Sequence, residues 1–111
     1  MKQISRRRKG RRLQNLVRAK ILDTFDILRP TDISVASTGE NGADVKLSKI
    51  AKRILPYQFE CKNQERLSTL HKWFAQSKKH GKLEPILIVK MKASKPLLIM
   101  DLDHFFKIVK E

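Results

Sequence analysis

The sequence predicts a single α/β domain built around a central, mixed five-stranded sheet that is flanked by helices. Three observations predict it. The 111 residues suffice for one domain but not for two, 41% of them are hydrophobic, and the apolar residues recur partly at helical and partly at strand spacing. This hydrophobic share is ordinary for a globular protein, so we expect the chain to fold despite its net charge of +14. The expected order is helix, three strands, helix, two strands, helix.

A long helix is expected near the start of the chain. Leu13, Val17 and Ile21 belong to an apolar stripe with helical spacing, which predicts a helix over residues 8–25. Pro30 prevents the helix from continuing further.

Three short strands are expected next, over residues 33–36, 43–47 and 57–62. A turn rich in Ser, Thr, Gly and Asn separates the first two strands. Ser48 is expected to cap a short helix between the second strand and the third.

The second half of the chain predicts a helix over residues 65–79 and two buried strands over residues 86–91 and 97–100. Asp101 is expected to cap a final helix over residues 102–109. The five strands together would form the sheet.

The positive charge is concentrated at the start of the chain. The first 20 residues hold nine Lys and Arg residues and no acid, whereas the other 91 residues hold 16 cations and 11 anions. Such a segment is typical of nucleic-acid-binding proteins, because neutralising phosphates releases condensed counterions. We therefore expect residues 1–8 to form a basic arm on a domain that spans residues 9–111. A solubilising tail and a patch that binds acidic membranes remain alternatives.

Two groups of cations are expected to contact DNA phosphates, which would position DNA without reading its sequence. The N-terminal group consists of Arg6, Arg7, Arg8, Lys9, Arg11 and Arg12. The second group surrounds the connection between the last two strands and consists of Lys90, Lys92 and Lys95. For this second group, an ordinary solvated surface is the alternative.

Several classes of protein are excluded by composition. A lone cysteine, Cys61, excludes an intrachain disulfide framework and a Cys-rich zinc site. No apolar run approaches 18 residues, so no membrane span is expected. The first 20 residues lack the apolar core of a secretory signal, whereas an Arg-rich organellar presequence remains an alternative.

Two carboxylates and one ammonium predict a site for phosphodiester hydrolysis. Glu60 and Lys62 lie two residues apart on an expected strand and so share a face, and strand pairing could bring Asp44 beside them. Two carboxylates suit a hard divalent cation. A neighbouring ammonium can orient the attacking water and stabilise charge on the phosphate. The alternative is an ordinary surface ion pair between Glu60 and Lys62.

The order and spacing of these residues resemble the PD-(D/E)xK nuclease superfamily. Within it, the sequence is most similar to the Holliday junction resolvases of archaea and to small resolvase-like nucleases of tailed phages. Four segments carry the resemblance: residues 9–14 (KGRRLQ), 37–44 (STGENGAD), 59–63 (FECKN) and 85–90 (PILIVK).

This resemblance implies a restriction-endonuclease-like fold and a set of site residues. Asp44 and Glu60 would bind Mg²⁺ or Mn²⁺, helped by the main-chain carbonyl of Cys61. Lys62 would serve the attacking water, and Ser37 would lie near the scissile phosphate.

The sequence departs from the family pattern at two positions. Gln14 occupies the place where archaeal relatives often have a metal-associated glutamate, and a neutral amide contributes no charge to metal binding. Ala43 replaces the proline that gives the superfamily motif its name.

The activity implied is that of an Mg²⁺-dependent endodeoxyribonuclease that resolves Holliday junctions by paired cuts. The resemblance further implies a homodimer, because two strands are cut symmetrically, and a location in the cytoplasm of a prokaryotic or phage-infected cell. One alternative is a structure-selective or nicking nuclease without a preference for junctions. The other is a catalytically silent nucleic-acid-binding module.

Overall fold

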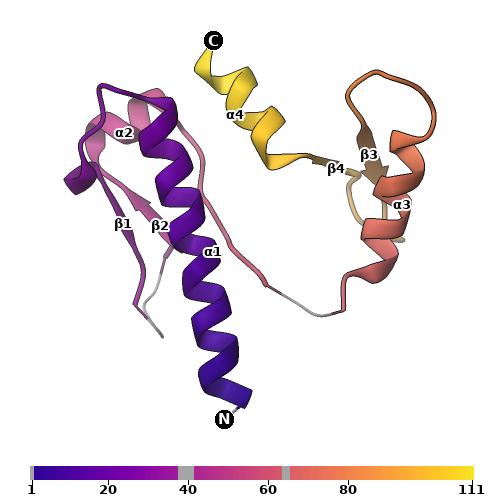
Figure 1. The fold of residues 1–111 in the computed structure, drawn as a ribbon, viewed down its shortest axis with the longest axis horizontal. Coiled ribbons are helices and arrows are strands. Elements are labelled where there is room, and N and C mark those ends of the chain that lie inside the picture. Colours follow the sequence, from indigo (N-terminus) through magenta and orange to yellow (C-terminus); the bar gives the residue numbers. More distant parts are fainter. Residues whose placement is uncertain (1, 38–41, 64–65) are drawn as a thin grey trace. The chain divides into compact units, whose positions relative to one another are not determined.

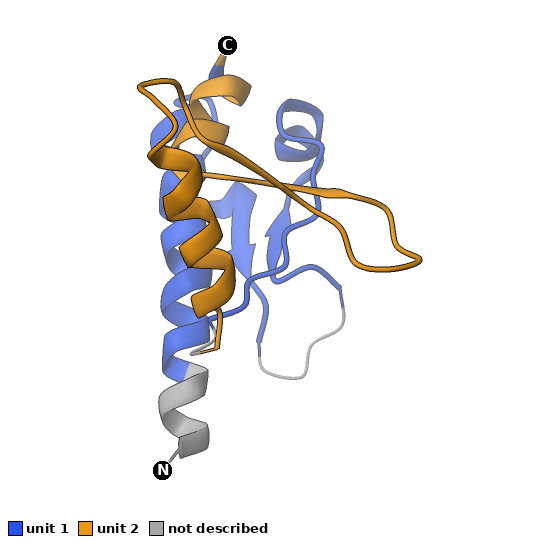
Figure 2. Cartoon of the chain, turned by 90° about the vertical axis from the view of Figure 1, so that its right-hand side faces the viewer, with its two compact units in different colours: residues 1–63, 110 blue, residues 64–109, 111 orange. Residues whose placement is uncertain are grey.

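The structure is a computed structural model that describes residues 2–37, 42–63 and 66–111, with side chains described from Arg8 onward. The chain divides into two compact units (Figure 2). The first unit holds residues 1–63 and Lys110, and the second holds residues 64–109 and Glu111. Among the described residues there are four α-helices and four strands (Figure 1). None of these helices is both long and apolar enough to cross a membrane.

The first unit begins with one long helix and continues into a small antiparallel sheet. Its elements are α1 (Lys2–Thr24), a 3₁₀ turn (Pro30–Asp32), β1 (Ile33–Val35), β2 (Val45–Leu47) and α2 (Lys49–Ile54). β1 and β2 pair with Val35 opposite Val45. The helix was expected to begin at Arg8, but it begins at Lys2. The basic residues of the expected arm therefore form the first turns of α1.

The core of the first unit lies where α1 packs on the two-stranded sheet (Figure 1). Val17 and Ile21 of the predicted apolar stripe are buried, and so are the strand residues Ile33 and Val45. Strand residues alternate between faces, so burial of Val45 places Lys46 on the opposite face of the sheet. The face that carries Lys46 thus belongs to the outer surface of this unit.

Arg18 supports the fold and is not one of the cations available to a partner. Its Nε donates to the carbonyl oxygen of Ile33 at 2.8 Å, and its second guanidinium nitrogen donates to that of Pro30 at 2.7 Å. Because charged donors make the stronger hydrogen bonds, we expect Arg18→Ala to lower the free energy of unfolding by about 2 kcal/mol. Urea unfolding measures this loss, and Arg12→Ala, at an exposed position of the same helix, is the control. Equal stability of the two variants would contradict the assignment.

The carboxylate of Asp32 ties the 3₁₀ turn to the start of α2. One oxygen accepts a hydrogen bond from the backbone N–H of Arg29 at 2.8 Å, and the other accepts from the Ser48 hydroxyl at 2.7 Å. The Ser48 hydroxyl in turn accepts from the N–H of Ala51 at 3.2 Å, which confirms the predicted cap. The bonds from Arg29 and then Ser48 lower the pKa of Asp32 below its ordinary value of 3.8.

The stability of the protein is therefore expected to fall in acid partly through Asp32. Because the pKa of this group is lower in the folded state, its contribution is fully present well above pH 3.8 and is lost as the pH falls through the folded-state pKa. Unfolding midpoints measured between pH 7 and pH 3 test this. Asp32→Asn should flatten the acid limb of the profile, and an unchanged limb would refute the role given to this carboxylate.

The second unit pairs one helix with a β-hairpin and adds a C-terminal helix. Its elements are α3 (Ser68–Lys78), β3 (Ile86–Val89), β4 (Leu97–Met100) and α4 (Leu102–Lys110). β3 and β4 are antiparallel, with Ile86 opposite Met100, and α3 contacts β3. The expectation that these strands are buried is wrong, because Ile88 is 60% and Leu97 65% exposed on a hairpin that pairs with no further described strand. Asp101 caps α4 as predicted, since its carboxylate accepts from the N–H of Asp103 at 2.8 Å.

The prediction of a central five-stranded sheet, and with it of a restriction-endonuclease-like fold, is wrong. The described residues form two separate two-stranded sheets, β1–β2 and β3–β4. The expected strand over residues 57–62 is reduced to a single bridge between Phe59 and Val45. The expectation of one domain over residues 9–111 stays a prediction.

Local hydrogen bonds explain why the middle strand does not form. The N–H of Tyr57 donates to the carbonyl of Leu55 at 2.8 Å, so the chain enters the segment through a tight turn. Two residues after Phe59, the N–H of Cys61 donates to the Asp44 side chain, not to a strand partner. A side chain therefore takes one of the donors that a longer ladder would use. β3 and β4, joined by a short connection, pair only with each other among the described residues.

Candidate functional site

Asp44 is fixed between the end of β1 and the segment that follows Pro56. Its carbonyl accepts from the N–H of Ala36, and its N–H donates to the carbonyl of Phe59, both at 2.9 Å. Its carboxylate oxygen Oδ2 accepts from the N–H of Cys61 at 2.6 Å. The other oxygen, Oδ1, accepts no hydrogen bond from the residues that the structure describes. The carboxylate is thus held through one of its oxygens, and no described donor binds the other.

Glu60 and Lys62 flank the residue that binds Asp44, and they contact each other. Lys62 Nζ lies 3.3 Å from Glu60 Oε1, and the two side chains are 68% and 63% exposed, respectively. The expected shared face arises without the expected strand. An ion pair this exposed contributes about 0–1 kcal/mol to stability, so the fold depends little on it.

Cys61 lies between these groups as a half-buried thiol. Burial, and then the negative charges of Asp44 and Glu60, raise the pKa of the Cys61 thiol above its ordinary value. The thiol therefore stays protonated at neutral pH. Both carboxylates are close enough to Cys61 to act on the same group, which places them on one small region of the first unit.

The other predicted site residues, Ser37 and Gln14, also belong to the first unit. Ser37 is exposed and follows Ala36, whose N–H binds Asp44, so the chain brings Ser37 to the edge of the site. Gln14 is half-buried on α1, and no described contact joins it to Asp44 or Glu60. Residues 38–41 of the serine-containing loop lie outside the described residues.

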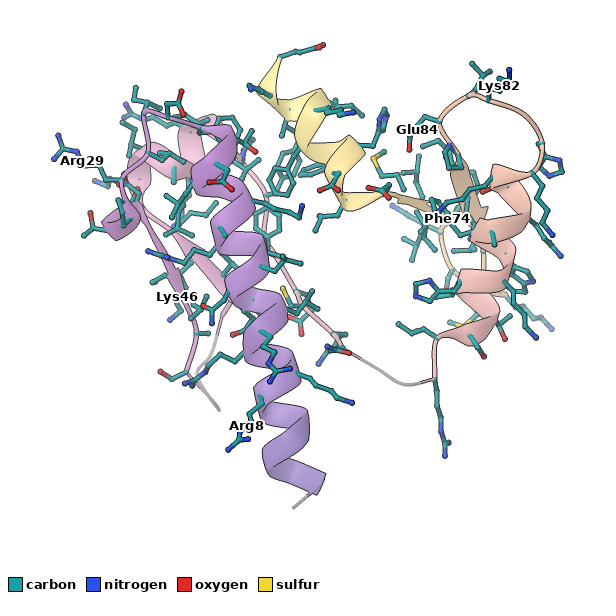
Figure 3. The ribbon with its side chains drawn as sticks, viewed as in Figure 1. Arg8, Arg29, Lys46, Phe74, Lys82 and Glu84 are labelled. Carbon is teal, nitrogen blue, oxygen red and sulfur yellow. The ribbon has the colours of Figure 1, made fainter. Side chains whose placement is uncertain are left out.

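The basic residues of α1 are connected to the same region. The side-chain amide of Asn63 donates to the carbonyl of Lys9 at 3.4 Å, across 54 residues of sequence. The described cations of this helix that are exposed are Arg8, Arg11 and Arg12, of which Figure 3 labels Arg8. The side chains of Arg6 and Arg7 lie outside the described ones. Lys90, Lys92 and Lys95 are all exposed, and they lie in the second unit.

A further group of cations in the first unit was missed by the sequence reasoning. Lys46 on β2, which Figure 3 labels, and Lys49, Lys52 and Arg53 on α2 follow Asp44 within nine residues. Three of them, Lys49, Lys52 and Arg53, are exposed. The signal in the sequence was the density of four cations in eight residues, which the larger N-terminal run obscured.

The donor set is compatible with Mg²⁺ or Mn²⁺. Such ions are often held by one or two carboxylates, with waters and substrate phosphates completing the shell, and Asp44 and Glu60 supply that number. The observation that fits is Oδ1 of Asp44, which accepts no hydrogen bond from the described residues. Within the described ranges, no cluster of three or more His, Cys, Asp or Glu side chains is arranged to hold a metal ion, so a tighter all-protein site is not present there.

Comparisons with protein-family models, with curated proteins and with solved structures find no match.

Proposed function

We propose that this chain is a metal-dependent DNA endonuclease that resolves Holliday junctions by paired hydrolysis of phosphodiester bonds. The observation that carries the proposal is the hydrogen bond from the N–H of Cys61 to the Asp44 carboxylate. In the sequence, Cys61 stands between Glu60 and Lys62, whose side chains contact each other. The same unit contains the basic helix α1. A fixed carboxylate, a second carboxylate and an ammonium beside a cationic surface are the groups that phosphodiester hydrolysis needs.

Each residue has a separate task in this proposal. Asp44 and Glu60 would hold a divalent cation, which when bound supplies positive charge that stabilises the phosphate and activates water. Lys62 would orient the attacking water, and its contact with Glu60 keeps the ammonium beside the carboxylates. Water adds to phosphorus, one ester oxygen leaves with a proton, and the strand is cut.

Junction resolution adds a requirement for symmetry. Two strands of a four-way junction must be cut at matching positions, which a two-fold homodimer achieves by presenting two copies of the site. Recognition would depend on branch shape and phosphate charge, for which the cations of α1 are suited.

The alternative favoured by a specific observation is a catalytically silent nucleic-acid-binding module. The exposed ion pair between Glu60 and Lys62 has the geometry of an ordinary surface salt bridge. Such a module would bind DNA equally well with and without Mg²⁺. A nuclease with the same site but no junction preference is the remaining alternative.

A cleavage assay on a labelled four-way junction and a matched linear duplex, each with Mg²⁺ and with EDTA, separates these functions. Symmetric, Mg²⁺-dependent cuts in the junction alone are the expected result. Equal cutting of both substrates would leave a nuclease and remove the junction claim. Binding without cutting in every condition would leave the silent module.

A further inference from the structure

A groove of about 400 Å³ opens on the first unit, lined by chain neighbours of Asp44 and of Phe59. Its lining residues are Ala43, which precedes β2, then Val45, Lys46 and Leu47 of β2, Lys52 of α2, and Tyr57 and Gln58 after Pro56. Three of them, Ala43, Val45 and Gln58, are direct chain neighbours of the hydrogen-bonded pair Asp44 and Phe59. The groove therefore adjoins the backbone that positions the Asp44 carboxylate.

The lining combines an aromatic ring with positive charge. Tyr57 is 48% exposed although it is a large aromatic residue. Lys46 and Lys52 bring two ammonium groups to the same groove, and none of its described lining residues is acidic. Lys49 and Arg53 on α2 extend the positive charge beyond the groove. An apolar ring between cations is the pattern by which proteins bind single-stranded nucleic acids.

We infer that this groove binds one unpaired nucleotide of the DNA strand, next to the phosphate that is cleaved. This inference rests on the proposed function and deepens it by naming the kind of DNA that the site accepts. The ring of Tyr57 stacks on the base, and Lys46 and Lys52 bind the phosphates on either side of it. A volume of about 400 Å³ falls within the usual range for a small-ligand site.

Stacking on Tyr57 requires a base that is no longer stacked on its neighbouring bases in the DNA. A fully paired linear duplex offers none, whereas mismatched or single-stranded segments do so at low cost. The groove would thus add a preference for unpaired DNA to the general attraction of the basic surface. This preference is independent of any metal ion, so it can be measured when cleavage is prevented.

The test is the affinity for a short, fluorescently labelled oligothymidine in EDTA, measured by fluorescence anisotropy. Tyr57→Ala is expected to weaken binding about tenfold, whereas Tyr57→Phe, which keeps the ring, should bind like the unchanged protein. Lys46→Ala and Lys52→Ala should each lower the slope of log K against log salt by about 0.7. Lys82→Ala, at an exposed position of the second unit that Figure 3 labels, is the matched control and should change neither.

Unchanged affinity for Tyr57→Ala, in a variant whose thermal unfolding midpoint is unchanged, would overturn the inference. Equal salt slopes for Lys52→Ala and Lys82→Ala would also overturn it. Failure of the groove and failure of the proposed function are distinguishable. If the protein cuts DNA with Mg²⁺ but Tyr57→Ala leaves its affinity for oligothymidine unchanged, only the inference about the groove is contradicted. If Tyr57→Ala lowers the affinity for oligothymidine but the unchanged protein does not cut DNA, only the proposed nuclease function is contradicted.

Discussion

Asp44→Asn is expected to reduce DNA cleavage on the order of a thousandfold while leaving DNA affinity unchanged or improved. The amide oxygen of Asn can still accept from the N–H of Cys61, which Asp44 binds at 2.6 Å, so the local structure should persist. The substitution removes the negative charge that would hold the cation. It also removes repulsion toward phosphates, which is why affinity does not fall. Initial cleavage rates and anisotropy titrations on the same junction measure the two effects.

The matched control for this substitution is Asp26→Asn. Asp26 is an exposed carboxylate in the same unit, just after α1, so the charge change is identical and only the position differs. We expect its cleavage rate to stay within about twofold of the unchanged protein, as for surface substitutions away from a site. Retained activity in Asp44→Asn, or equal losses in both variants, would contradict the role given to Asp44.

Deleting residues 1–8 is expected to weaken DNA binding and to flatten its dependence on salt. The deletion removes Lys2, Arg6, Arg7 and Arg8, and each phosphate contact contributes about 0.9 to the slope of log K against log salt. The slope should therefore fall by about three to four. The core of the unit should survive, because Val17 and Ile21, the buried residues of α1, lie well beyond the deleted part.

The control for the deletion removes as many cations from elsewhere in the chain. Substituting Gln for four exposed lysines of the C-terminal half lowers the net charge equally; these are Lys79, Lys82, Lys107 and Lys110. Its salt slope should change by less than one. An unchanged slope in the deletion variant, or equal slopes in the two proteins, would show that the start of α1 does not contact phosphates.

Helices and caps could be predicted from the sequence because their determinants are local. The apolar period of Val17 and Ile21 predicted both the helix and its buried side, and Ser48 and Asp101 cap α2 and α4 as expected. The start of α1 at Lys2 was missed, since the basic residues before Arg8 carry no apolar period. An apolar period marks only the part of a helix that packs on the core, so it does not show where an exposed helix end begins.

The sheet could not be predicted because strand pairing depends on distant partners. Alternation after Pro56 indicated a strand, yet the N–H groups of Tyr57 and Cys61 bind Leu55 and the Asp44 side chain. Periodicity does not report such competition for donors. The apolar runs of β3 and β4 were correctly identified as strands, but their expected burial was wrong, and their pairing with each other alone was not expected.

The candidate site was partly predictable for a related reason. Spacing of two residues placed Glu60 and Lys62 together, and the structure brings them to 3.3 Å without a strand. The hydrogen bond from the N–H of Cys61 to the Asp44 carboxylate has no sequence signature, because every residue except proline has a backbone N–H. The groove at Tyr57 was missed because this residue was assigned to the face of a strand that does not form.

In the proposed function, Asp44 and Glu60 hold the metal ion on which cleavage depends. The most direct test of this role is the initial rate of junction cleavage as a function of Mg²⁺ concentration, for the unchanged protein, for Glu60→Gln and for Glu84→Gln, whose carboxylate lies in the second unit. Glu60→Gln is expected to need at least about tenfold more Mg²⁺ to reach half of its maximal rate, or not to cut, because one of two charged ligands is lost. Glu84→Gln should follow the curve of the unchanged protein. Identical Mg²⁺ curves for all three proteins, or cleavage that persists in EDTA, would contradict the claim.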